Sequence, residues 1–240
     1  MTTAPPQLQD SRRNGLLGAL GYSDWQALTP WMAFSNVAGG EVLYQSGSII
    51  RQVYFPISCV VAQVQVLADG ATTQIALVGP EAAAGLSVFM GADLAPCLTL
   101  VQSAGAIVGI DAAMLKLEFR RGGHFMDLTL RCVQALMQQQ AQTAVCSRHH
   151  PLEQQLCRWL LLSVDRMQAR ELAVTHEFVA GMLGVRRESI TEVAHRLQNR
   201  GLIRVHRGHI EVVDRVGLQN AACECYGVVK RQYESLLPES

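Results

Sequence analysis

The spacing of hydrophobic and polar positions divides the chain into regions of different predicted structure. Between residues 39 and 111, short β-branched runs alternate with Gly, Pro, Asp and Ser roughly every 8 to 12 residues, which is typical of a small all-β sandwich or barrel. The predicted strands are 41–44, 53–55, 59–67, 72–78, 98–102 and 107–110. Before them, residues 14–34 predict one or two short helices, with Ser23 as an N-cap.

A longer helix is predicted from residue 124 to about residue 146, after a break at Gly122 and Gly123. Its apolar residues recur every three or four positions and form one stripe, which consists of Met126, Leu130, Val133, Met137, Ala141 and Ala144. Such a stripe packs either against the helix's own domain or against a second helix in a coiled coil. Glutamines at 138–140 and 142 weaken the first interpretation without excluding it.

Pro151 begins a further predicted helix, because proline is favoured at the start of a helix, where its missing N–H needs no partner. A hinge between two domains is therefore predicted at residues 147–151. The resulting division of the chain is a first domain at 1–122, a connecting helix at 123–147 and a second domain at 148–240.

Two short helices joined by a tight turn are predicted from Thr175 onward. Thr175 can cap the first helix, and Gly184 stands where the turn requires a positive φ. The second helix starts around Arg186 and ends at Gly201. Two short strands follow at 202–205 and 209–213, with a turn at 207–208. This order indicates a helix-turn-helix followed by a wing, in which the second helix enters the major groove of DNA.

The charge distribution supports this interpretation only when it is resolved along the chain. With 20 basic and 20 acidic residues the net charge is zero, which favours neither nucleic acid nor a membrane as a partner. Between residues 186 and 209, however, six arginines stand against two glutamates. The positive charge is therefore concentrated on the predicted second helix and wing.

The residue types at the start of the second helix fit base recognition. Arginine can bond guanine O6 and N7, glutamate can accept from the cytosine amino group, and serine can reach a base or a phosphate. The candidate base contacts are Arg186, Arg187, Glu188 and Glu192, and the candidate phosphate contacts include Ser189, Arg196, Arg200 and Arg207. The opposing interpretation is a solvated charged helix in a winged domain that binds protein.

Residues 175–190 resemble, without a gap, the helix-turn-helix of the bacterial Crp/Fnr transcription regulators, whose recognition helix carries an Arg-Glu-Ser/Thr-Val/Ile core, here Arg187-Glu188-Ser189-Ile190. The resemblance covers nearly the whole chain. It implies an α+β fold with an N-terminal β-roll like a cyclic-nucleotide-binding domain, a long dimerisation helix and a C-terminal winged helix.

The resemblance also implies roles for individual residues. Arg187 and Glu188 would bind a G·C pair in each half-site, and Ser189 with Thr175 and His176 would hold phosphates. Glu192 stands where the catabolite-activator branch has a second arginine, so the half-site need not match that of this branch.

The predicted β-roll lacks the residues that relatives use to bind effectors. Members that bind cyclic nucleotides hold the phosphate with an Arg-Ser or Arg-Ala pair, but residues 85–98 contain no arginine, and Ala95 and Pro96 stand about where that pair belongs. We therefore expect no binding of cAMP or cGMP in that manner. No cysteine precedes Cys59, which argues against the iron-sulfur cluster of the oxygen-sensing branch. Haem would have Cys59, Cys97 and His124 as candidate axial ligands.

The seven cysteines are odd in number and scattered, which indicates reduced thiols in a cytoplasm rather than a secreted disulfide framework. Cys146, His149, His150 and Cys157 are a candidate soft-metal or redox cluster next to the hinge. A second candidate is the Cys-Glu-Cys-Tyr sequence at 223–226. The alternative for both is buried small residues on helices, because a Cys-x-Cys pair on a helix points in divergent directions.

These observations predict a homodimeric, sequence-specific DNA-binding transcription regulator in the cytoplasm. Residues 1–17 do not have the pattern of a signal peptide, and no stretch reaches 18 consecutive apolar residues. The expected partners are double-stranded DNA, a second copy of the chain, an unknown small-molecule effector and RNA polymerase, with no membrane and no assigned cofactor.

Two alternatives stay open, namely a protein-binding adaptor with a degenerate β-roll and a regulator that senses haem, a metal or redox state. An enzyme is not expected, because the sequence shows no supported catalytic triad, Gly-rich phosphate loop or paired carboxylates.

Overall fold

The structure is a computed structural model that describes residues 8–236, and its fold is α+β. A β-roll of two antiparallel sheets forms its centre, with strand orders β1-β7-β3 and β2-β6-β4-β5. The strands are β1 Met32–Val37, β2 Val42–Tyr44, β3 Gln52–Pro56, β4 Val60–Val66, β5 Thr72–Val78, β6 Leu98–Ser103 and β7 Gly105–Asp111. The six predicted strands are confirmed to within two residues at each end.

Strand β1 is the part of the roll that the sequence pattern did not predict. Residues 32–34 were expected to end a helix, but they begin a strand that pairs antiparallel with β7, with Met32 opposite Ile110. Most β1 side chains are partly or fully exposed, so the strand lacks the strong apolar alternation by which strands are recognised. Its pairing with β7 is therefore a tertiary effect.

The N-terminal helices are short, and Asn14 rather than Ser23 is the capping residue. They are the 3-10 helix η1 Leu8–Arg13, α1 Gly15–Ala19, α2 Tyr22–Leu28 and the 3-10 helix η2 Thr29–Trp31. The prediction for Ser23 is wrong, because α2 begins at Tyr22 and Ser23 lies inside it. The buried Asn14 side chain accepts from the amides of Leu16 and Leu17 and donates to the carbonyls of Pro56 and Ala82, which fixes α1 to the roll. Residues 1–7, which form part of the segment examined for a signal peptide, lie outside the described range.

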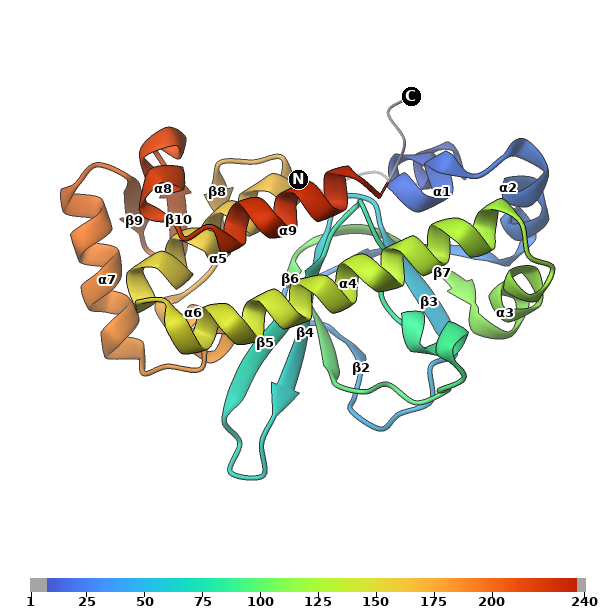
Figure 1. The fold of residues 1–240 in the computed structure, drawn as a ribbon, viewed down its shortest axis with the longest axis horizontal. Helices are drawn as coiled ribbons and strands as arrows, with labels where there is room; N and C mark the ends of the chain where they lie inside the picture. The colour runs from blue at the N-terminus through green and yellow to red at the C-terminus, as the bar shows by residue number, and fades with distance from the viewer. Residues whose placement is uncertain (1–7, 237–240) are drawn as a thin grey trace.

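Two helices follow the roll. The first is α3 Ala112–Arg120, capped by the Asp111 carboxylate, and the second is the long helix α4 His124–His149. Gly122 and Gly123, with φ of 77° and 78°, make the break between them, as expected. Figure 1 shows α4 crossing the front of the roll from the N-terminal helices to the C-terminal part.

The predicted hinge at 147–151 is wrong for residues 147–149, because α4 remains helical as far as His149. The break comprises only His150, the C-cap of α4, and Pro151, the N-cap of α5 Leu152–Met167. None of the described helices is long and apolar enough to cross a membrane.

The C-terminal part is a winged helix-turn-helix, as predicted. Its helices are α6 His176–Leu183, α7 Arg187–Asn199, α8 Arg215–Ala221 and α9 Cys225–Glu234, and its sheet has the order β8-β10-β9. The wing is formed by β9 Ile203–His206 and β10 His209–Val212, while β8 Glu171–Leu172 adds a short strand that was not predicted. Helix α9 returns along α4 and packs against it (Figure 1).

Helix α5 joins the winged part to the roll through buried polar contacts. The Trp159 indole N–H donates to Gln74 Oε1 at 2.8 Å, and the Gln102 amide donates to the Ser163 hydroxyl at 2.9 Å. Nearby, Arg166 Nε lies 2.7 Å from Glu81 Oε1, with the arginine side chain almost fully buried. These contacts and a continuous apolar core place the winged part in a defined position on the roll.

Candidate nucleic-acid interface

The outer face of α7 is set by the residues that it buries. Gly184 adopts φ of 66° and its N–H donates to Ala180 O, so α6 ends in a left-handed turn that redirects the chain. Thr175 Oγ1 accepts from the Phe178 amide at 3.1 Å and caps α6, as expected. The side chains of α7 that face the core are Ile190, Val193, Ala194 and Leu197. The opposite face of α7 therefore points to solvent.

The predicted base-contacting residues lie together at the start of this exposed face. Arg186, Arg187, Glu188 and Glu192 are all exposed, and Ser189 is half-buried between them and the core. Across residues 8–236, none of the four charged side chains makes an ion pair. The geometry thus leaves two guanidinium groups and two carboxylates available on a rigid helix.

Two predicted phosphate contacts lie farther along α7 and are already paired. Arg196 Nε is 3.3 Å and Arg200 Nη1 is 2.6 Å from the carboxylate of Glu153, which lies in the first turn of α5. Both arginines remain about half exposed, and exposed ion pairs are worth roughly 0–1 kcal/mol. The pairing with Glu153 therefore holds these two guanidinium groups only weakly. Sequence spacing gave no indication of this pairing.

The wing presents one available arginine at its tip. Arg207 is exposed next to Gly208, whose φ of 75° makes the tight turn, and it has no ion-pair partner among the described residues. Arg204, by contrast, is 2.7 Å from Glu211 on the facing strand. His209 is 3.2 Å from Glu171 of β8.

His176, a predicted phosphate contact, makes a hydrogen bond within the protein. Its Nδ1 is 3.0 Å from Thr191 Oγ1. The Thr191 hydroxyl donates its one proton to Arg187 O at 3.1 Å, so in the contact with His176 it is Nδ1 that donates and the hydroxyl oxygen that accepts. Partial burial, together with the charge of Arg187, lowers the pKa of His176. A neutral His176 thus connects the start of α6 to the first turns of α7. Thr191 was not singled out in the sequence.

Helix α4 carries a second candidate surface, formed by the predicted apolar stripe. Leu130 is 47% and Met137 is 60% exposed, and Ala141 and Ala144 are exposed as well. Met126 is half-buried, and Val133 is buried within the protomer, so these two add little exposed area. Val145, which is 50% exposed, extends the surface and was not predicted.

The β-roll contains a cavity of about 280 Å³ between the sheet β2-β6-β4-β5 and α4. Its polar lining consists of Tyr44, Gln63, Gln65, Ser87, Thr99 and Gln140. Pro96 lines the cavity where relatives that bind cyclic nucleotides have a phosphate-binding pair, and the lining residues include no lysine, arginine or histidine. A buried phosphate in this cavity would therefore have no cationic partner.

The candidate haem ligands are not arranged as an open site. Cys59 and Cys97 are buried within the roll. His124 Nε2 is 3.0 Å from Ala19 O, to which it donates.

Comparison with known proteins agrees with this geometry. Residues 154–221 match the Crp-like helix-turn-helix domain, the segment from α5 to the end of α8. No curated protein sequence is significantly similar to the chain.

Solved structures with the same fold are numerous and distant in sequence. A protein from Eubacterium rectale assigned to the Crp/Fnr family of transcriptional regulators is 17% identical, with a TM-score of 0.69 over 87% of this chain and 98% of its own. A CRP-family transcriptional regulator from Thermus thermophilus is 20% identical, with a TM-score of 0.66 over 78% and 96% of the two chains. FixK2 from Bradyrhizobium japonicum is 14% identical, with a TM-score of 0.69 over 80% and 98%. The likeness therefore extends from the β-roll to the wing.

Proposed function

Because residues 154–221 form a Crp-like helix-turn-helix domain within the fold of the Crp/Fnr transcription regulators, we propose that this chain is a homodimeric, sequence-specific DNA-binding regulator of transcription. The observation that carries the proposal is the start of α7, where Arg186, Arg187 and Glu188 stand exposed on a helix whose other face is buried. A helix of this kind inserts its first turns into the major groove.

The proposed contacts follow the positions of the side chains. Arg186, Arg187, Glu188 and Glu192 contact base edges, with Arg187 on guanine and Glu188 on cytosine. The phosphate contacts are assigned to Thr175, Ser189, Arg196, Arg200 and Arg207. His176, which was assigned to a phosphate by resemblance, contributes by holding the first turns of α7 through Thr191.

We assign dimerisation to the exposed stripe of α4. Leu130, Met137, Ala141 and Ala144 are separated by seven, four and three residues, which is the repeat of a coiled-coil seam. An apolar stripe of this length on the outside of a helix is unusual unless another surface covers it. The division into a sensor-like domain at 1–122, a dimerisation helix at 123–147 and a DNA-binding domain at 148–240 belongs to the same proposal, with the mechanical break at His150 and Pro151.

The effector, if the roll binds one, is proposed to be uncharged and rich in hydrogen-bonding groups. The cavity offers amides and hydroxyls but no cation, so it suits a ligand without a phosphate. RNA polymerase is the remaining partner that the family likeness suggests, and no surface is assigned to it.

Selection from a randomised pool of DNA duplexes tests the proposal. The expected result is an enriched near-palindrome whose half-sites lie about 10 base pairs apart, because two recognition helices of a dimer meet the same face of the duplex. Arg187→Ala is expected to weaken binding to the selected site by about 1–3 kcal/mol, or roughly 5- to 150-fold. Arg121→Ala, which removes an exposed arginine at the C-terminal end of α3, is the matched control and keeps wild-type affinity.

The outcome that would contradict the proposal is a pool without an enriched sequence, or equal losses in both variants. Residual binding with no dependence on salt would favour the protein-binding adaptor instead, since phosphate contacts make affinity fall as salt rises.

A further inference from the structure

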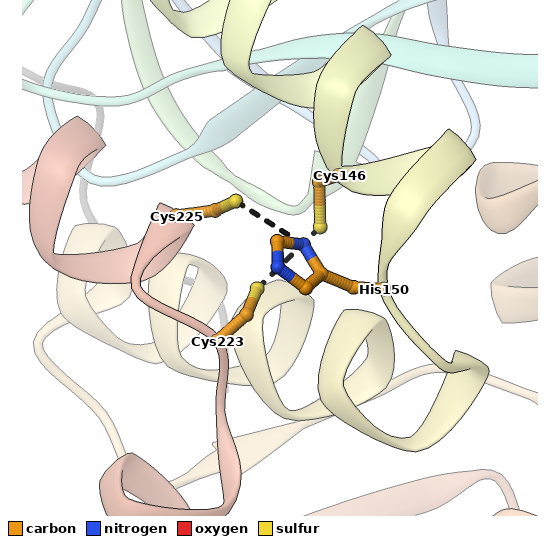
Figure 2. A group of neighbouring side chains, drawn as sticks. All are labelled: Cys146, His150, Cys223 and Cys225. Atoms are coloured by element: carbon orange, nitrogen blue, oxygen red, sulfur yellow. Dashed lines mark hydrogen bonds between the residues drawn. The ribbon is translucent and has the colours of Figure 1, made fainter.

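Four side chains with metal-binding groups converge at the break between α4 and α5. Cys146 lies in the last turn of α4, His150 caps that helix, Cys223 precedes α9 and Cys225 is its first residue. One ligand atom from each of the four lies within 4.8 Å of the other three. Figure 2 shows the three sulfur atoms gathered around the His150 ring, with Cys223 and Cys225 to the left of the ring and Cys146 above it.

The convergence has a local cause in each segment. Cys146 and His150 are four residues apart and therefore share one face at the end of α4. The prediction that Cys223 and Cys225 diverge is wrong, because α9 starts only at Cys225 and Cys223 lies in the preceding turn. The sequence grouping was right for Cys146 and His150 but wrong for its other members, since His149 is exposed and Cys157 is buried in the main core of α5.

We propose that Cys146, His150, Cys223 and Cys225 bind one zinc ion. Structural zinc is tetrahedral, with Zn–S bonds of about 2.3 Å and Zn–N bonds of about 2.0–2.1 Å, and this geometry sets neighbouring ligand atoms about 3.5–3.8 Å apart. The Cys146 and Cys223 sulfurs are 3.5 Å apart, and Cys225 Sγ is 3.5 Å from His150 Nδ1. Three cysteines and one histidine are a common structural zinc set.

The compactness of the group distinguishes one ion from an iron-sulfur cluster. A cluster distributes its cysteine ligands over different iron atoms, which sets their sulfurs farther apart than ligands of a single ion. Mutual distances within 4.8 Å therefore fit a mononuclear site. The softness of three thiolates selects zinc over magnesium or calcium, which prefer oxygen ligands.

The surroundings provide the contacts that orient zinc ligands. His150 Nε2 is 3.3 Å from Glu224 Oε2, so Nδ1 is free to face the ion while the carboxylate holds the other nitrogen. The Gln142 amide donates to Cys225 Sγ at 3.0 Å. All three cysteines are buried, which excludes water from the ion.

The charge environment also suits thiolate ligands. The positive charge of the buried Arg158 acts on Cys146. This guanidinium would offset part of the negative charge that three bound thiolates bring to the site.

A disulfide between Cys146 and Cys223 is the rival occupant of this place. Their sulfurs are 3.5 Å apart, well beyond the S–S bond of about 2.05 Å, and all cysteines in the described chain are free. A disulfide would also leave Cys225, His150 and Glu224 in their present arrangement without a function. The zinc assignment uses Cys225 and His150 as ligands and Glu224 as the partner of His150.

Bound zinc would fasten the end of the dimerisation helix and the hinge to the start of α9. The far end of α9 is already held where the Arg166 guanidinium stacks 5.0 Å from the Tyr233 ring. With zinc bound at its start, α9 would be held at both ends alongside α4, and this would fix the angle between α4 and α5. The site does not depend on the proposed DNA contacts, which lie on α7.

Elemental analysis of the full-length protein, purified under reducing conditions, tests the proposal directly. The expected result is about one zinc ion per chain. After removal of zinc by a chelator, added Co²⁺ is expected to give the visible bands of a tetrahedral site and a sulfur-to-cobalt charge-transfer band in the near ultraviolet. The cobalt measurement needs only the wild-type chain, so it decides the question even if variants fold poorly.

Variants then assign the ligands. Cys223→Ser and Cys225→Ser are expected to lose zinc and the cobalt spectrum, and His150→Asn to weaken both. The matched controls are Cys157→Ala and His149→Asn, which remove a neighbouring buried cysteine and the adjacent exposed histidine and are expected to keep about one zinc per chain.

Three results would overturn the assignment. They are a wild-type chain without zinc that also gives no thiolate-cobalt spectrum, a zinc content unaffected by Cys223→Ser and Cys225→Ser, and a Cys146–Cys223 disulfide found by peptide mapping of protein denatured without reductant.

Discussion

Glu188 and Arg187 stand side by side at the start of α7 and have different expected effects on DNA recognition. Arginine gains from the negative potential of any duplex, whereas glutamate is repelled by phosphates and is retained only where it accepts from a base. Glu188→Ala is therefore expected to relax the preference at one base pair of each half-site while affinity for unrelated DNA rises. Selection with the variant measures this change, and an unchanged preference at every position would refute the assigned role.

The position of His176 predicts a dependence of stability on pH. Burial and Arg187 lower its pKa, so the unfolded chain binds this proton more readily than the folded chain. The neutral His176 side chain contributes its full stability above the ordinary histidine pKa of about 6.5, and this contribution is lost as the pH falls from there through the lower pKa of the folded chain. The free energy of unfolding, measured with urea at pH 5.5 and at pH 7.5, is expected to differ less between the two pH values for His176→Gln than for the wild-type chain.

His195→Gln is the matched control for this measurement. His195 lies on the same helix and is exposed. Its substitution is expected to preserve the wild-type difference between the two pH values. If the free energy of unfolding changes between the two pH values by the same amount in His176→Gln and in the wild-type chain, His176 is not the source of the pH dependence.

At the residue scale, the sequence identified exposed groups better than paired ones. The exposure of Arg187 and Glu188 followed from the helical positions of Ile190 and Val193, which have to be buried. The pairing of Arg196 and Arg200 with Glu153 was not predictable, because more than 40 residues separate the partners. The cluster of thiols was not predicted, because the sequence placed both Cys223 and Cys225 on a helix, whereas α9 begins only at Cys225.

Among the elements, α4 carries the prediction about assembly. Its exposed stripe is expected to close against a second copy, so a charge placed there would be buried without a partner. Met137→Glu is expected to raise the dimer dissociation constant more than about tenfold, which corresponds to ~1.4 kcal/mol. Sedimentation at several concentrations measures the change.

The control for α4 is Leu117→Glu, which places the same charge on an exposed apolar position of α3. It is expected to leave self-association unchanged. If Met137→Glu associates as the wild-type chain does, the stripe is not the dimer seam.

The elements themselves were largely predictable from residue spacing. The strands from β2 to β7 and helices α4 to α7 were recognised because their apolar residues follow periods of two or about 3.6. Strand β1 was not recognised, because it is defined by its pairing with β7. The last three residues of α4 were missed because they are exposed polar residues that do not continue the apolar repeat.

At the scale of the whole molecule, the cavity of the roll predicts what the protein does not bind. Cyclic AMP or cyclic GMP at 100 times a dissociation constant would raise the free energy of unfolding by about 2.7 kcal/mol. With no cation in the cavity lining, we expect millimolar concentrations of either nucleotide to leave the melting temperature unchanged. A saturable rise in melting temperature would contradict this expectation.

The arrangement of the whole chain went beyond what the sequence predicts. The order of roll, long helix and winged helix followed from the pattern and the family resemblance. The docking of α5 on the roll through Trp159 and Gln74, and of Arg166 on Glu81, depends on polar contacts between distant segments. Such contacts have no periodic signature, so only the structure reveals them.

The central claim, that α7 recognises a DNA sequence, is tested most directly by the ratio of affinities for the selected site and for an unrelated duplex, measured by fluorescence anisotropy at one salt concentration. The account predicts a ratio of about 10³ or more for the wild-type chain and for Arg121→Ala, and a ratio reduced roughly 5- to 150-fold for Arg187→Ala. A wild-type ratio near one, or a ratio unaffected by Arg187→Ala, would contradict it.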